Sequence, residues 1–334
     1  MRNEALRNLL ESVGWQSARR RRIAGDASPR RYERLIRSGG DTAILMDAQP
    51  SVCGSQQPFL AATDYLRRQG FSAPKILATD LRAGFILLED LGDALFARVV
   101  ERNPDAEAEI YLAAINLLAQ IRKIQDPGPF QPYTVDDQVQ LAALAFEWYR
   151  RVASGSELQP EIMSQFTNVM KQLIAELPPQ MVFTHRDFHA ENLIWLPERE
   201  GVQKVGLLDI QDASLCHPAY DLVSLLEDAR RDLSQSLRET CLRAYCDITG
   251  NNKDELDFAL AVCGSQRNLR IIGTFARLAV LDGKSSYLDL LPRVWQHLQH
   301  DLAHPKLADL SKFVKKELPA VTHLTLTALR TACQ

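Results

Sequence analysis

A polar loop between short strands, within a mainly helical pattern, is the feature that most limits the possible folds of this sequence. The segment THRDFHAENLIW, residues 184–195, places His185, Asp187, His189 and Asn192 within eight positions. The apolar run MVF precedes it, and NLIWL, the turn PEREG and VQKVGLLDI follow it. The later runs have the pattern of a β-hairpin, so we expect the polar loop at the front of that hairpin.

The pattern along the chain changes near residue 95. Residues 23–90 have the pattern of strands with one helix, at 58–70, and the runs AILMDA and GFILLEDLGD are typical of strands. Beyond residue 95, Asn103 as N-cap and Pro104 at the first helical position predict a helix. Further helical patterns cover roughly 137–154, 159–176, 218–231, 234–247, 253–281 and 286–302. We expect a small strand-rich part, a large helical part and a hinge at residues 90–95.

Composition limits the class of protein more than its function. The chain has 334 residues, of which 46% are hydrophobic and 24% charged, as in an ordinary soluble globular protein. Its net charge of −3 gives no reason to expect nucleic acid as a partner, and no stretch approaches the ~20 apolar residues of a membrane span. The N-terminus lacks a signal-peptide core, and the six cysteines form no CxxC pair. We therefore expect a cytoplasmic protein without a membrane partner. The basic run ARRRR at 18–22 is expected to be solvated.

The residues of the polar loop leave three interpretations open. His185 and His189 have the spacing of two helical metal ligands, but HExxH is absent and no further His or Cys stands nearby at ligand spacing. A structural turn, in which His185 bonds to the backbone, is the second interpretation. The third is a catalytic loop for phosphoryl transfer, a reaction that asks the protein mainly for position and charge.

The third interpretation gives each polar group a role. A carboxylate must accept or orient the proton of the attacking hydroxyl, and Asp187 suits that role. Mg²⁺ prefers oxygen donors, which Asn192 and a second carboxylate would supply. Asp209 stands at the end of KVGLLD, seventeen residues after Asn192, where the hairpin closes. An Asn and an Asp that bracket one hairpin are more specific than the loop motif alone.

The two segments HRDFHAEN and LLDIQDA resemble the catalytic and metal-binding segments of the aminoglycoside phosphotransferase/choline kinase family. The family pattern is H-x-D-x-x-x-x-N, then an Asp that closes the next strand, and His185, Asp187, Asn192 and Asp209 match it. The resemblance implies an α+β, bilobal protein-kinase-like fold. Its small β-rich N-lobe would span residues 1–92 and its large, mainly helical C-lobe residues 93–334. By the same resemblance the protein is an ATP-dependent phosphotransferase, and Asn192 and Asp209 bind Mg²⁺.

The resemblance also implies roles outside the metal site. Asp187 would be the catalytic base, and His185 would brace the loop. The segment GFILLEDLGD resembles the hinge segment of the family. The backbone of that hinge would meet adenine around Glu89, Asp90 and Leu91.

Several other stretches resemble one branch of small-molecule kinases. DASPRRYERL, LLEDLGD, LLDIQDA and QRNLRIIGTFARL are together similar to bacterial N-acetylmuramate/N-acetylglucosamine kinases. The resemblance implies phosphorylation of the anomeric C1 hydroxyl of an amino sugar in cell-wall recycling, by a monomer whose partner is a small-molecule sugar. The alternatives are an aminoglycoside or choline-type kinase and, from another class, a nucleotide-binding pseudokinase scaffold. The exact sugar and hydroxyl stay open.

The sequence departs from the family pattern on the phosphate side. The strand that usually carries the phosphate-pairing lysine is AILMDA, and the lysine position falls at Met46 or Asp47. Neither side chain holds a phosphate directly. Ser28, Arg30 and Arg31 are candidate replacements in nucleotide binding, because guanidinium groups suit phosphate oxygens. An alternative is that the two arginines extend the solvated basic run. The lysine position would then have no basic replacement, so the pseudokinase stays an alternative.

Substrate residues are indicated only weakly. His189 stands where the family often has His, and Glu227, Arg230 and Arg231 follow the catalytic segments. An acidic residue would meet amines of an aminoglycoside, whereas an arginine would meet the carboxylate of a lactyl sugar. A solvated helix face with local charge pairs is the alternative. Asp221, in a helix that resembles the one after the family's metal site, is expected to be a structural brace.

Overall fold

The computed structural model describes residues 2–23 and 29–333 and divides into two compact units. The first comprises Met1–Leu117, Gly128–Phe130 and Ala190–Ala213; the second comprises Leu118–Pro127, Gln131–His189 and Ser214–Gln334. The segment 190–213 belongs to the first unit although it lies far along the chain. The sequence predicted an N-lobe of residues 1–92 and a C-lobe of residues 93–334, and this division stays a prediction.

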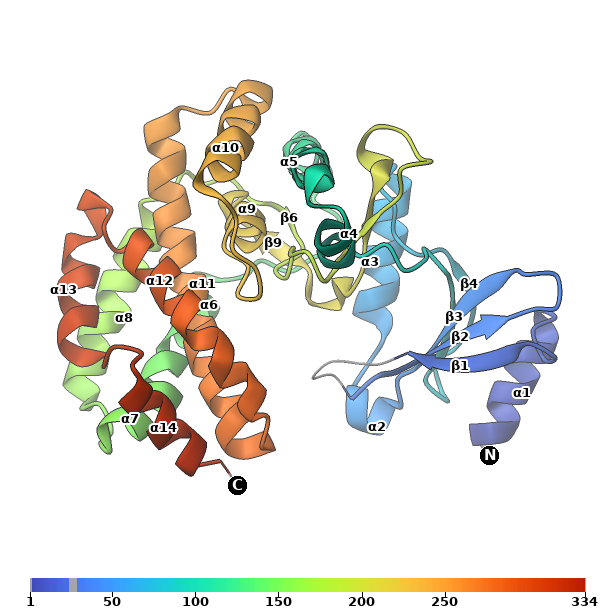
Figure 1. The fold of residues 1–334 in the computed structure, drawn as a ribbon, viewed down its shortest axis with the longest axis horizontal. Helices are drawn as coiled ribbons and strands as arrows, with labels where there is room; N and C mark the ends of the chain where they lie inside the picture. The colour runs from blue at the N-terminus through green and yellow to red at the C-terminus, as the bar shows by residue number, and fades with distance from the viewer. Residues whose placement is uncertain (1, 24–28, 334) are drawn as a thin grey trace. The chain divides into compact units, whose positions relative to one another are not determined.

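A five-stranded antiparallel sheet forms the centre of the first unit (Figure 1). Its strand order is β1-β2-β3-β5-β4. The bounds are β1 Arg19–Ile23, β2 Arg31–Ile36, β3 Thr42–Asp47, β4 Ile76–Asp80 and β5 Phe85–Glu89. The strands expected within AILMDA and GFILLEDLGD are therefore present. The basic run ARRRR lies in the exposed edge strand β1.

One face of this sheet is covered by α1, Arg2–Ser12. Leu6, Leu9 and Leu10 recur at three and four residues, so they lie on one side of the helix. They pack with alternate strand residues, among them Leu45 and Leu87, in one buried cluster. The other residues of those strands consequently face the opposite side of the sheet.

The rest of the first unit consists of short helices and one hairpin. The helices are α2 Pro50–Cys53, α3 Gln57–Arg68, α4 Phe96–Arg102, the short turn η1 Pro104–Ala106 and α5 Glu107–Ile121, of which the residues from Leu118 on belong to the second unit. The hairpin is formed by β7 Leu193–Trp195 and β8 Val205–Leu207, with η3 Gly201–Lys204 between them and η4 Ile210–Asp212 after them. The expected helix at 58–70 corresponds to α3, and the expected hairpin is present.

The second unit is mainly helical. Its helical segments are α6 Val135–Leu144, the π-turn η2 Ala145–Arg150, α7 Arg151–Ser154, α8 Pro160–Ala175, α9 Ala219–Leu226, α10 Gln235–Thr249, α11 Lys253–Asp282, η5 Ser285–Leu290, α12 Leu291–Asp301, η6 Pro305–Leu307, α13 Ala308–Glu317 and α14 His323–Thr331. Two strands, β6 Val182–Thr184 and β9 Ser214–Cys216, pair antiparallel. None of the helices in the described ranges is both long and apolar enough to cross a membrane.

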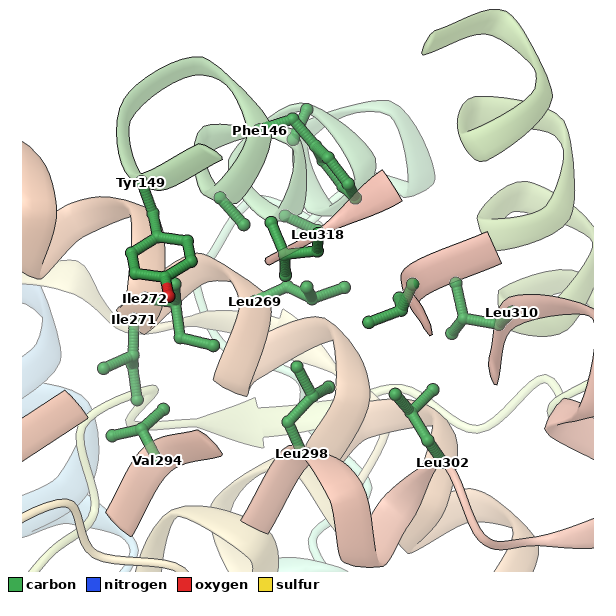
Figure 2. Packing of buried hydrophobic residues seen from close by; sticks show 14 of the residues in the cluster. Phe146, Tyr149, Leu269, Ile271, Ile272, Val294, Leu298, Leu302, Leu310 and Leu318 are labelled. Atoms are coloured by element: carbon green, nitrogen blue, oxygen red, sulfur yellow. The ribbon is translucent and has the colours of Figure 1, made fainter. Parts of the chain in front are cut away.

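The core of the second unit is built around α11. Figure 2 shows Phe146 and Tyr149 of η2 near Leu269 and Ile272 of α11, with Leu298 of α12 close by. All five are almost fully buried. Although α11 is buried along most of its length, the charged residues near its two ends and Arg277 are exposed or half-buried, whereas Arg267 is buried and Arg270 half-buried.

A glycine allows α11 to approach η2 closely. A Cβ atom on Gly273 would lie 2.2 Å from the carbonyl carbon of Leu144 and 2.5 Å from the amide nitrogen of Ala145. These atoms belong to the backbone and have no room to move aside. Gly273 therefore fixes the position of α11 against the chain around η2.

Two helical expectations differ from the structure. The pattern at 218–231 is helical only over Ala219–Leu226, because the chain leaves the helix at Glu227 with φ −126° and ψ 47°. The helices α1, α2, α4, α13 and α14 were not expected from the sequence. Each is short, so its stability comes mainly from packing on other elements.

Candidate active site

The polar loop begins directly after β6, in the second unit. The pairing of β6 with β9 holds its first residue, His185, at the end of a two-stranded ribbon. The carboxylate of Asp221 in α9 then accepts two backbone N–H groups, from His185 at 2.6 Å and from Arg186 at 2.9 Å. Arg186 has φ +75°, a conformation that a non-glycine residue adopts only with support. Asp221 is thus the brace expected from the sequence.

His185 supports the loop from inside the protein. Its side chain is only 1% exposed, and its Nδ1 accepts the backbone N–H of Asp187 at 3.3 Å. Since Nδ1 is the acceptor, a neutral His185 carries its proton on Nε2. This placement suits a bracing residue, and its catalytic contribution stays a prediction.

The carboxylate of Asp187 forms an ion pair with Arg270 of α11. Nη2 of Arg270 lies 2.9 Å from Oδ1 of Asp187, and the two side chains are 15% and 34% exposed. Burial alone would raise the pKa of Asp187, but the positive charge of Arg270, assisted by His189, Arg267 and His185, holds that pKa well below its usual range. Asp187 is therefore a carboxylate of low basicity that is held in one place.

His189 interacts electrostatically with Asp187 and with residues of the loop after α9. Its backbone N–H donates to the carbonyl oxygen of Asp187 at 3.1 Å. Burial lowers the pKa of the His189 ring, against the opposing charges of Asp228 and Asp187 and with the help of Arg230. The carboxylate of Asp228 accepts the backbone N–H of Arg230 at 2.8 Å. His189 and Arg230 therefore lie in one charged neighbourhood, and Arg231, the next residue, is half-buried.

Glu227 has a different environment from the one expected of a substrate residue. It is 1% exposed, and its carboxylate accepts hydrogen bonds from Arg238 at 3.0 Å and Asn268 at 2.9 Å. The same Asn268 donates to Asp301 at 2.9 Å, and burial raises the pKa of Asp301 well above its usual value. Glu227 belongs to a buried polar network, and its role toward a substrate stays a prediction.

Asn192 and Asp209 lie at the same end of the hairpin in the first unit. The backbone carbonyl of Asn192 accepts the N–H of Leu208 at 2.9 Å, one residue before Asp209. Asp209 has a left-handed conformation, with φ +56° and ψ +44°, which turns the chain sharply into η4. Non-glycine residues in this region cluster at functional sites. The convergence expected from the spacing is present in the backbone.

The donors at this end of the hairpin suit a hard cation. Gln211 Nε2 donates to Oδ1 of Asp209 at 3.0 Å, so one carboxylate oxygen is oriented by a neutral group. An amide oxygen and a carboxylate fit Mg²⁺, which takes one or two protein carboxylates together with substrate phosphates and water. Residues 2–23 and 29–333 contain no group of three or more His, Cys, Asp or Glu side chains placed to hold a metal.

The candidates on the phosphate side differ in position. Ser28 lies outside the described residues. Arg30 precedes β2, and its Nη1 lies 3.9 Å from Oδ1 of Asp209. Arg31 is exposed and paired in register with Asp47 of β3.

The side chains of the expected hinge segment are engaged within the first unit. Glu89 accepts hydrogen bonds from Arg199 at 2.9 Å and from the N–H of Lys75 at 2.9 Å. Asp90 forms a buried ion pair with Arg34 of β2 at 2.6 Å, and Leu91 packs on the hairpin. A ligand would meet this segment through its backbone. Arg34 was not expected, although its place in the alternating run RYERLI was visible in the sequence.

Comparison with solved structures defines the fold. Over 99% of this chain and the whole of the other, the structure is similar to a choline/ethanolamine kinase family protein from Mesorhizobium loti, with a TM-score of 0.63 and 14% identity. It is also similar to an aminoglycoside phosphotransferase from Streptomyces rimosus, with a TM-score of 0.53 and 16% identity over 80% of this chain and 98% of the other. These similarities confirm the expected protein-kinase-like α+β fold.

Comparison of sequences identifies the family. The model of the phosphotransferase enzyme family matches residues 19–259, and the chain belongs to this family. It is 37% identical to an N-acetylmuramate/N-acetylglucosamine kinase from Caulobacter vibrioides, over 96% of this chain and 98% of the relative. A kinase of the same name from Pseudomonas aeruginosa is 31% identical over 87% of this chain and 86% of the relative. The protein is a phosphotransferase with an alcohol group as acceptor.

Proposed function

We propose that this phosphotransferase transfers the γ-phosphoryl group of ATP to the anomeric C1 hydroxyl of N-acetylmuramate or N-acetylglucosamine. The names of the relatives support an amino sugar as the acceptor. The ion pair between Asp187 and Arg270 is the observation that supports the C1 hydroxyl as the site of phosphorylation. A carboxylate whose basicity is lowered in this way is a poor base for an ordinary alcohol. The hemiacetal hydroxyl at C1 is more acidic than an alcohol and needs a weaker base.

The proposed step uses the residues of the polar loop. A bond forms between the C1 oxygen and the γ-phosphorus, while the bond from that phosphorus to the bridging oxygen of ADP breaks. The proton of the C1 hydroxyl passes to the carboxylate of Asp187. Asn192 and Asp209 would hold Mg²⁺, which when bound neutralises charge on the phosphates. The backbone of residues 89–91 would meet the adenine ring.

The substrate side is proposed to lie along the loop after α9. Arg230 and Arg231 are the candidates for the lactyl carboxylate of N-acetylmuramate, because a guanidinium group pairs well with a carboxylate. His189 lies in the charge environment of both Asp187 and Asp228, so it would orient the sugar near the base. The buried Glu227 would hold the start of this loop in place through the hydrogen bond that its carboxylate accepts from Arg238.

An acceptor screen tests this function. The protein is incubated with ATP, Mg²⁺ and one acceptor at a time from the set N-acetylmuramate, N-acetylglucosamine, kanamycin and choline, and products are measured by mass spectrometry. We expect a monophosphate of the two N-acetyl sugars, which the matched variant Asp187→Asn forms roughly 10²–10⁴ times more slowly. Turnover of kanamycin or choline alone would favour the aminoglycoside or choline-type alternative. Nucleotide binding without turnover of any acceptor would favour a pseudokinase.

A further inference from the structure

The register of β2 and β3 shows which side chains share the sheet face opposite α1. Tyr32 pairs with Met46, and Arg31 pairs with Asp47. Residues directly opposite each other in an antiparallel pair extend to the same face. Met46 is fully buried, whereas Asp47 forms an ion pair with Arg2 of α1, on the other face. Protein kinases carry their phosphate-pairing lysine on the third strand, but β3 offers no cation for this purpose.

Arg30 lies next to this face and beside Asp209. It stands two residues before Tyr32, and its side chain forms a hydrogen bond with that of Tyr32. Its Nε donates to Oε1 of Gln56 at 3.3 Å. Gln56 is itself fixed, since its Nε2 donates to the carbonyl oxygens of Cys53 at 3.3 Å and Gly54 at 3.1 Å. The Arg30 side chain is only 12% exposed, so its charge is held in one place.

We propose that Arg30 supplies the cation that binds the phosphates of the nucleotide next to Asp209, in place of the lysine that β3 lacks. This inference rests on the proposed function. The 3.9 Å separation between Arg30 Nη1 and Asp209 Oδ1 exceeds a hydrogen bond but places the two charges at one location. Asp209 would hold the metal ion, which would supply charge to the phosphates, and the guanidinium group of Arg30 would add a second positive charge beside it.

Two polar neighbours of Arg30, Tyr32 and Gln56, are suited to this task because they are uncharged. Burial, followed by the charge of Asp209, raises the pKa of Tyr32 to about 12, so the phenol keeps its proton at neutral pH. Gln56 carries no charge. The two groups hold the guanidinium in position without neutralising it. Arg31 lacks this setting, because it lies on the face that carries Asp47.

Nucleotide binding measured by calorimetry tests the inference without relying on turnover. Magnesium ATP and adenosine are each titrated into the parent and the variants Arg30→Gln, Arg30→Lys and Arg22→Gln. We expect Arg30→Gln to weaken magnesium ATP binding about 10–100-fold and to leave adenosine binding within about twofold, since one charge-assisted contact to phosphate is lost. Arg30→Lys should recover part of the affinity, and Arg22→Gln, in the exposed strand β1, should match the parent.

Two results would overturn the inference. In the first, Arg30→Gln binds magnesium ATP as tightly as the parent. In the second, adenosine binding falls as far as ATP binding, which would mean that Arg30 acts through the structure of the unit. Failure of the parent itself to bind magnesium ATP is a different result, because it would contradict the proposed function as a whole.

Discussion

The Asp187 carboxylate accepts a 2.9 Å hydrogen bond from Arg270, which lies 83 residues further along the chain. The pair joins the beginning of the polar loop to the middle of α11, a helix that is buried along most of its length. An arginine in this position keeps the carboxylate ionised and fixes its direction, but it also weakens it as a base. This combination favours an acceptor hydroxyl that loses its proton easily.

Replacing Arg270 should lower turnover without weakening nucleotide binding. In Arg270→Gln the carboxylate of Asp187 loses this ion pair, so less positive charge opposes burial, which raises its pKa. We expect kcat to fall about 10–100-fold and the KM for ATP to stay within about twofold, with partial recovery in Arg270→Lys. Arg277→Gln, on an exposed position of the same helix, is the matched control. A kcat of Arg270→Gln close to that of the parent would remove Arg270 from the account.

Asp221 should make turnover sensitive to acid. Burial raises its pKa to about 6. As the pH falls through about 6, the carboxyl gains a proton and loses one of the two acceptors that hold His185 and Arg186. We expect the kcat of the parent to fall below this pH, while Asp221→Asn has a kcat lowered about 10-fold and nearly constant between about pH 5 and pH 8.

Stability separates this effect from unfolding. Because the folded-state pKa of Asp221 lies above the unfolded value, the protonated group contributes stability that is lost as the pH rises through about 6. Its contribution to stability therefore grows as kcat falls. Melting curves of the parent and of Asp221→Asn over the same pH range measure the difference. If kcat and the melting temperature both fall with falling pH in the parent but not in Asp221→Asn, Asp221 does not act on turnover in the proposed way.

Asp209→Ala should abolish the effect of magnesium on nucleotide binding. The side chain lies at the end of the hairpin that begins at Asn192, so its loss removes one of the two proposed ligands. We expect the variant to bind ATP with the same affinity with and without Mg²⁺, and to show no turnover. Asp212→Ala, an exposed carboxylate in the following turn, is the control. If Asp209→Ala keeps the magnesium dependence of the parent, Asp209 is not a ligand.

Arg230→Gln should distinguish between the two proposed sugars. N-acetylmuramate carries a lactyl carboxylate that N-acetylglucosamine lacks, and Arg230 contributes positive charge near His189. We expect kcat/KM for N-acetylmuramate to fall about 10-fold and that for N-acetylglucosamine to change less than about twofold. The second sugar is the internal control. Equal losses for both sugars would place Arg230 in the support of the loop rather than in recognition.

The hairpin and its two ends could be predicted from the sequence because all the signals are local. The strand-like runs, the turn PEREG and the spacing from Asn192 to Asp209 lie within some twenty residues. The position of Arg270 could not be predicted in the same way. Nothing near residue 270 says that this side of α11 meets the polar loop, since that depends on how the helices pack.

The phosphate side could be predicted only in part for a similar reason. Arg30 and Arg31 are neighbours with the same chemistry, and the sequence offers no means of choosing between them. The pairing of Tyr32 with Met46 supports our proposal of Arg30, because alternation along a strand sends adjacent residues to opposite faces. The basic run ARRRR was expected to be solvated, and β1 is indeed exposed, but its pairing with β2 depends on residues outside the run.

The product formed from a sugar blocked at C1 tests the central claim most directly. N-acetylglucosamine and its methyl glycoside are incubated separately with the protein, ATP and Mg²⁺, and the phosphorylated product is followed by phosphorus NMR and mass spectrometry. The account predicts an anomeric 1-phosphate from the free sugar and no phosphate above background on the methyl glycoside, whose other hydroxyls remain available. Phosphorylation of the methyl glycoside at the rate of the free sugar would contradict it.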